Sequence, residues 1–117
     1  MEEAKKRKRL PMLKGQTYET KSGCGPLYIT MNEDSDGLFE MFVTMGKAGG
    51  CATSQTEAIG RLATLALRYR VPVQQIVKQL QGISCHSPVG INEEKTLSCA
   101  DAIAKVIRNY TKGEKIK

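Results

Sequence analysis

The feature that most constrains the fold is one change in the spacing of apolar and β-branched residues along the chain. Up to about residue 45 these residues form short runs separated by glycine-containing turns, as in strands. After the segment 46–50 they recur every three or four residues, as on the buried face of a helix. A chain of 117 residues with one such change predicts a single α+β domain.

The first half is expected to be an antiparallel meander of three strands, over residues 17–21, 27–31 and 38–45. Each run is rich in β-branched or aromatic residues. Residues 22–26 read as the first turn, because glycine adopts unusual backbone angles and Pro26 cannot donate a hydrogen bond within a central strand. Residues 33–37 read as the second turn, since Asp36-Gly37 is a strong hairpin signal.

The second half is expected to hold three helices packed on one face of this small three-stranded sheet. The first begins near Thr53 or Ser54 and runs to about Tyr69. Pro72 starts the second, Gly82 caps its end, and Ser98 caps the third, with Asp101 favoured by the helix dipole. The expected buried positions are Ile59, Leu62, Ala63, Ala66, Leu67, Val73, Ile76, Val77, Leu80, Ala102, Ile103, Val106 and Ile107.

The net charge of +6 is concentrated at the two ends of the chain. We therefore divide the sequence into a basic arm (1–14), a domain (15–110) and a basic tail (111–117). These ends are either solvated tails or a nucleic-acid-binding surface formed by Lys5, Lys6, Arg7, Lys8, Arg9, Lys112 and Lys115. Solvated tails are the favoured interpretation, because no aromatic residue interleaves with the N-terminal charges to stack on bases.

No apolar run approaches the roughly 20 residues that span a bilayer, and no apolar segment follows the charged N-terminus as in a secretory signal. We expect a cytoplasmic protein that does not enter membranes. In a reducing compartment, four cysteines favour metal or redox roles over a disulfide framework.

The four cysteines are separated in sequence but share similar local settings. Cys24 lies between two glycines, Cys51 follows two glycines and precedes a helix, Cys99 follows a cap residue, and Cys85 lies just past a helix end. Glycine-rich turns and helix starts present backbone N–H groups that stabilise thiolates, the form that binds metal. Four converging thiolates would suit zinc or an iron–sulfur cluster, whereas four unrelated buried thiols or a redox dithiol remain alternatives.

Other sites are weakly indicated. His86 adjoins Cys85, and adjacent residues rarely reach one ion, so we interpret it as a surface residue without a catalytic role. Lys47 stands at the start of the 46–50 turn, so the phosphate-loop pattern is absent and a tight turn positioning Cys51 is favoured.

The sequence resembles the TSCPD domain found near the C-terminus of adenosylcobalamin-dependent (class II) ribonucleotide reductases and in stand-alone four-cysteine proteins. The motifs GCG, GKAGGC, QLQGISC and SCAD occur in the family's order within residues 13–108. At the third cysteine the family commonly has Cys-Pro, whereas this chain has Cys85-His86.

The resemblance implies that Cys24, Cys51, Cys85 and Cys99 are the family's four cysteines. The reductase barrel is absent from these motifs, so we expect an accessory module that does not reduce ribonucleotides alone and acts through a partner, such as a ribonucleotide reductase chain. The expected ion is zinc, with an iron–sulfur cluster as the other option. Two alternatives stay open: a nucleic-acid-binding module that uses its basic ends on a metal-stabilised scaffold, and a thiol redox carrier.

Overall fold

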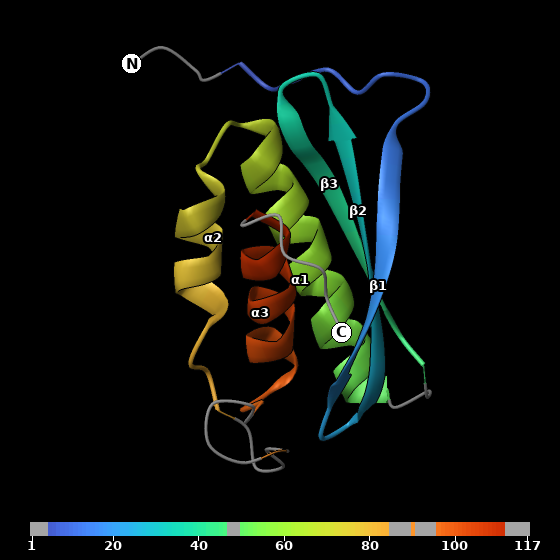
Figure 1. Ribbon diagram of the computed structural model, residues 1–117, viewed down its shortest axis with the longest axis vertical. Coiled ribbons are helices and arrows are strands. Elements are labelled where there is room, and N and C mark those ends of the chain that lie inside the picture. The colour runs from blue at the N-terminus through green and yellow to red at the C-terminus, as the bar shows by residue number, and fades with distance from the viewer. Residues whose placement is uncertain (1–4, 47–49, 85–89, 91–95, 112–117) are drawn as a thin grey trace.

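The computed structural model describes residues 5–46, 50–84, 90 and 96–111 of the chain. Three strands come first: β1 (Lys14–Ser22), β2 (Gly25–Asp34) and β3 (Gly37–Met45). Three helices follow: α1 (Gly50–Arg68), α2 (Val73–Leu80) and α3 (Cys99–Thr111). The strands form one antiparallel sheet in the order β1-β2-β3 (Figure 1). The predicted α+β fold is confirmed.

The strands extend further into the turns than the sequence indicated. Two-residue turns, Gly23-Cys24 and Ser35-Asp36, close the two hairpins. Pro26 was assigned to a turn but lies in β2, where it pairs with Lys21 of β1. Its carbonyl accepts a hydrogen bond from the N–H of Gly46 at 2.8 Å, just beyond the end of β3. The N–H group that a proline lacks would be needed only at this position, outside the sheet. The sheet therefore tolerates Pro26.

Helix α1 begins at Gly50, earlier than the predicted start at Thr53 or Ser54. The Ser54 hydroxyl does not cap the helix from outside but donates to the Cys51 carbonyl within its first turn, at 2.9 Å. Helix α2 begins at Val73, with Pro72 as its N-cap residue rather than its first residue, and its C-cap is Gln81 rather than Gly82, which follows with a positive φ of 80°. None of the described helices is long and apolar enough to cross a membrane.

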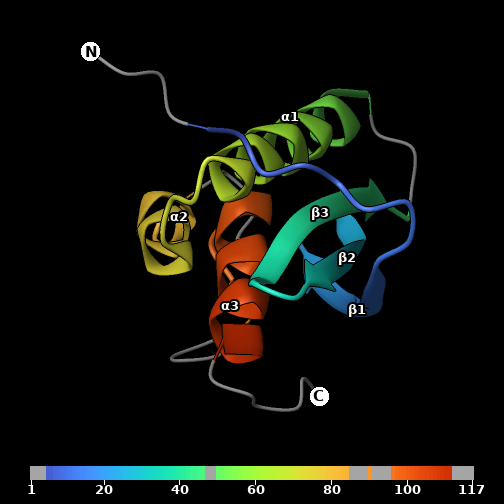
Figure 2. The same ribbon diagram turned by 90° about the horizontal axis from the view of Figure 1, so that it is seen from above.

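The helices cover one face of the sheet in two layers. Helix α3 lies against β1 and β2, α1 runs along β3, and α2 packs on α3 and α1 away from the sheet (Figure 2). The Thr64 hydroxyl of α1 bonds both the N–H and the carbonyl of Met41, each at 3.0 Å. Gly60, one turn earlier, brings the helix backbone against Met41 and Val43. A helix therefore occupies the place of a fourth strand beside β3.

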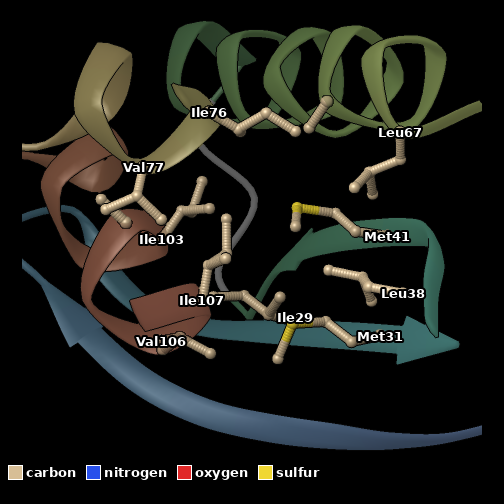
Figure 3. Packing of buried hydrophobic residues seen from close by; sticks show 12 residues of the cluster. Ile29, Met31, Leu38, Met41, Leu67, Ile76, Val77, Ile103, Val106 and Ile107 are labelled. Carbon is tan, nitrogen blue, oxygen red and sulfur yellow. The ribbon is translucent and has the colours of Figure 1, made fainter. Parts of the chain in front are cut away.

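The main core lies between the sheet and α3, and it is closed by α1 and α2 (Figure 3). Most predicted helix positions contribute to it, and those on α3 are all buried. The sequence analysis placed Leu62 in the core, but this prediction is wrong, because Leu62 is 68% exposed. The stripe of α1 that faces inward is centred on Ala63 and Leu67, so Leu62 points to the opposite side. The buried members are Ile29, Met31, Leu38, Met41, Ala63, Leu67, Ile76, Val77, Ile103, Ala104, Val106 and Ile107.

Part of the N-terminal arm packs against the fold. The Arg7 guanidinium donates to the carbonyls of Leu38 and Leu67 and forms an ion pair with Asp34. The guanidinium carbons of Arg7 and Arg68 lie 4.9 Å and 5.1 Å from the centroid of the Phe39 ring, which is fully buried. These contacts join the arm to the start of β3 and the end of α1.

A second arm residue, Arg9, forms two hydrogen bonds with the buried carboxylate of Glu40, at 2.9 Å and 3.1 Å. Asn32 donates to the same carboxylate at 2.7 Å. The hydrogen bond from Arg9 lowers the pKa of Glu40; burial opposes this shift, and the bond from Asn32 and the charges of Arg9 and Arg68 add to it. Glu40 is therefore a satisfied buried carboxylate.

Candidate metal centre

Cys24 lies in the turn between β1 and β2 and is exposed. Ser22, the last residue of β1, shapes this turn: its hydroxyl accepts from the Cys24 N–H at 3.2 Å and lies 3.2 Å from the Gly25 carbonyl. Gly25 has a φ of 130°, which residues with a side chain rarely adopt. Gly25 therefore serves a turn that presents Cys24 at one end of the sheet.

Cys99 is the first residue of α3, and its thiol contacts the same serine. Its Sγ lies 3.3 Å from the Ser22 Oγ, and the residue is half-buried. Ser22 is itself 6% exposed, so this contact is shielded from water. One hydroxyl thus connects the segment that carries Cys24 with the segment that carries Cys99.

Cys51 lies in the first turn of α1 and is exposed. Its neighbour Ala52 packs, together with Cys99, against a small apolar cluster of Leu27, Met45 and Ala102. In Figure 1 the β1–β2 turn, the start of α1 and the start of α3 lie together at the lower end of the molecule. The three described cysteines are therefore carried to one end of the fold, which we call the cysteine end.

Asp101 fixes the entry to α3. Its carboxylate accepts from the Gly82 N–H at 2.9 Å and from the Leu97 N–H at 3.0 Å, and Lys105 lies 3.4 Å away. Burial alone would raise the pKa of Asp101, but the two backbone bonds and Lys105 outweigh it and leave the pKa lowered. The end of α2 and the start of α3 are thereby tied together on either side of the segment that contains Cys85.

Ser98 caps α3 as predicted, because its hydroxyl accepts from the Asp101 N–H at 3.1 Å. The Asp101 side chain, by contrast, does more than complement the helix dipole. The sequence indicated this aspartate only as a cap element; its bond to Gly82 joins residues 19 apart, and no local pattern reveals such a contact. Ser22 was missed for the same reason, since its contact with Cys99 spans 77 residues.

The described residues do not form a complete metal site. Within residues 5–46, 50–84, 90 and 96–111, no three His, Cys, Asp or Glu side chains lie close enough together to hold a metal ion. Cys85 and its neighbour His86 lie outside the described residues. Thiolate sulfur is a preferred ligand of zinc and of iron–sulfur clusters, so the chemistry of the cysteine end fits either group.

The basic residues proposed for nucleic-acid binding are distributed differently. Arg7 and Arg9 are engaged by carboxylates and carbonyls of the fold, whereas Lys5, Lys6 and Lys8 are exposed. Lys112 and Lys115 lie outside the described residues. The arm thus uses two of its five predicted contact residues to hold the domain.

Comparison with protein families gives one match. Residues 4–111 match the family described as the TSCPD domain, which covers nearly the whole chain and includes all four cysteines. No curated protein and no solved structure matches the chain.

Proposed function

The chain belongs to the TSCPD domain family, and from this premise we propose that it is a metal-binding accessory module whose cysteine end is closed by four thiolates. The proposed ligands are Cys24, Cys51, Cys85 and Cys99, and the proposed ion is zinc. The module acts through a protein partner rather than by catalysis of its own.

The observation that carries this proposal is the link between distant cysteine segments. Ser22 lies within hydrogen-bond distance of both the Cys24 backbone and the Cys99 thiol. The first turns of α1 and α3 share one apolar cluster through Ala52 and Cys99. Two of these cysteines are exposed and a third lies at the same end of the fold. This placement favours a role in binding over a role in the hydrophobic core.

A bound zinc ion would cross-link the β1–β2 turn to the starts of two helices and to the segment after α2. Such a link contributes directly to folding, because the ligands are brought together only in the folded chain. Ser22 would then lie directly behind one ligand, and hydrogen bonds of this kind orient metal ligands and tune their basicity.

The proposed partner is the chain of a class II ribonucleotide reductase, as the family resemblance implies. In this proposal the module binds its partner in trans, and the metal would keep the binding surface in one shape. The reaction itself would remain with the partner.

The first experiment is elemental analysis of the purified protein with a count of accessible thiols. We expect one zinc ion per chain, and we expect each of Cys24→Ser, Cys51→Ser, Cys85→Ser and Cys99→Ser to lower zinc affinity by at least about tenfold to a hundredfold. Ser35→Cys is the control: it adds a fifth thiol to the turn at the other end of the sheet and should leave the zinc content unchanged.

Other outcomes of this experiment are equally informative. A metal-free protein that stays folded after all four cysteines are replaced contradicts the metal site. A metal-free protein with a reversible disulfide between two of the four cysteines supports the redox carrier instead. Detection of bound iron with acid-labile sulfide would indicate that the same four cysteines hold an iron–sulfur cluster instead of zinc.

A further inference from the structure

The outward face of α1 carries an unexpected line of apolar residues. Leu62, Leu65 and Tyr69 are 68%, 47% and 36% exposed, and the exposed Ala58 precedes them. Tyr69 continues the helix by one position, since its N–H donates to the Leu65 carbonyl at 3.2 Å. Spacings of four, three and four residues place all four side chains in one row, as at the contact positions of a coiled coil. We call this row the exposed seam.

An apolar groove runs beside the exposed seam, between α1 and α2. It has a volume of about 330 Å³, and its walls include Ala66, Val71, Ile76 and Leu80. Leu62 lies at its edge and belongs to both features. The lining contains no charged side chain, and its polar members are the glutamines Gln75 and Gln79.

The seam and the groove form one continuous apolar surface on the side of α1 away from the sheet. Figure 2 shows α1 along one side of the molecule, with the sheet, α2 and α3 all on the other side. Soluble proteins rarely leave such a surface uncovered, because burying it against another apolar surface is favourable. Since a protruding row and a hollow lie side by side, two copies of the surface can cover each other.

The side-chain sizes along the seam match an antiparallel pairing with a second copy. Ala58 precedes Leu62 by four residues, and Tyr69 follows Leu65 by four. A two-fold axis that places Leu62 against Leu65 of the second copy therefore also places Ala58 against Tyr69. The smallest residue of the seam then meets the largest, as dense packing requires.

The charges along α1 are compatible with this pairing. The net charge of +6 is concentrated at the two ends of the chain, and the residues of the seam and groove are uncharged. Glu57, Arg61 and Arg68 lie on the side of α1 that faces the end of β3. In this register Glu57 of each copy lies level with Arg70 of the other, just past the end of the helix.

We propose that α1 forms the interface of a two-fold homodimer, with the exposed seam of each copy packed antiparallel against the seam and groove of the other. The contact is separate from the cysteine end and does not depend on the metal site. It leaves the outer face of the sheet open.

The test is the mass of the full chain by sedimentation velocity over a range of concentrations. We expect a dimer with twice the mass of the 12.9 kDa chain. Leu62→Glu should weaken dimerisation by about a hundredfold or more, because it places an unpaired charge in the interface. Met12→Glu is the matched control: Met12 is 80% exposed on the arm, and its replacement should leave the dimer intact.

A size swap tests the antiparallel register. Ala58→Tyr should weaken the dimer by overpacking, and Tyr69→Ala should weaken it by leaving a cavity. The double variant restores the size match and should recover most of the lost affinity. A wild-type chain that stays monomeric at every concentration overturns the proposal, and so does a Leu62→Glu variant that dimerises like the wild type.

Discussion

The two ends of the sheet are stabilised in different ways. At the end formed by the β2–β3 turn, the chain provides its own cross-links: Arg7 bonds Asp34 and two carbonyls, Arg9 bonds Glu40, and two guanidiniums enclose Phe39. We call this the arginine end. At the cysteine end, the described contacts include a small apolar cluster, the hydroxyl of Ser22 and the Asp101 carboxylate that joins the end of α2 to the start of α3.

This difference shows where a bound group would matter most. The arginine end has ion pairs and a filled core, so an additional ligand has little to add there. The cysteine end places three cysteines on a turn and two helix starts, and the first N–H groups of a helix have no partner within it. A fold with arginine ion pairs at one end and three cysteines gathered at the other is suited to metal binding at the cysteine end.

The largest effect is expected at the arginine end. Phe39→Ala should lower the free energy of unfolding by about 4 kcal/mol, because it leaves a cavity and removes the ring that both guanidiniums contact. Phe42, on the same strand, is 54% exposed, and Phe42→Ala should cost less than about 1 kcal/mol. Urea denaturation measures both. Equal losses from the two variants would contradict the special role of the arginine end.

A smaller effect is expected where Asp101 ties α2 to α3. Asp101→Asn weakens the two backbone hydrogen bonds that the carboxylate accepts and should cost about 2 kcal/mol by the same measurement. Asp36 is the control, since it forms a surface ion pair with Arg70 at 3.5 Å, and Asp36→Asn should cost less than about 0.5 kcal/mol. Amide hydrogen exchange at Gly82 reports on the bond between α2 and α3. An exchange rate that is unchanged in Asp101→Asn would contradict this assignment.

The smallest effect is expected in the pH dependence of stability. The pKa of Glu40 is lowered mainly by its hydrogen bond with Arg9, so the folded chain binds this proton more weakly than the unfolded chain does. Its contribution to stability is complete above its ordinary pKa of 4.5 and is lost as the pH falls through the lowered value. Glu40→Gln should therefore flatten the decline of the urea midpoint in acid. An unchanged acid profile would mean that other carboxylates govern it.

Much of the fold could be predicted from local pattern. The alternation along β2 and β3 and the helical spacing in α3 each have one buried face, so the order and type of elements followed directly. Leu62 was misplaced because Leu62, Ala63, Ala66 and Leu67 all continue a helical period, and only the position of β3 decides which side of α1 faces inward.

The site was predictable only in part. Glycine and capping signals identified the turn of Cys24 and the start of α3, where the structure places two cysteines near Ser22. The long-range contacts were not predictable, because a serine hydroxyl or a buried carboxylate carries no periodic signal. Arg7 and Arg9 could not be distinguished from their lysine neighbours by charge, although arginine is the better residue for bidentate bonds to carboxylates.

The Thr64 contact with Met41 has a consequence for how this sheet can grow. The hydroxyl occupies the outward backbone groups of Met41, in the middle of β3, and Gly60 holds α1 against the same strand. Among the described strands, β1 forms the other edge of the sheet, and it carries Lys14 and Lys21. With β3 obstructed, a second copy can add to the sheet only at the edge strand β1. Such a pair leaves no further free edge, so fibril growth by repeated strand addition is blocked.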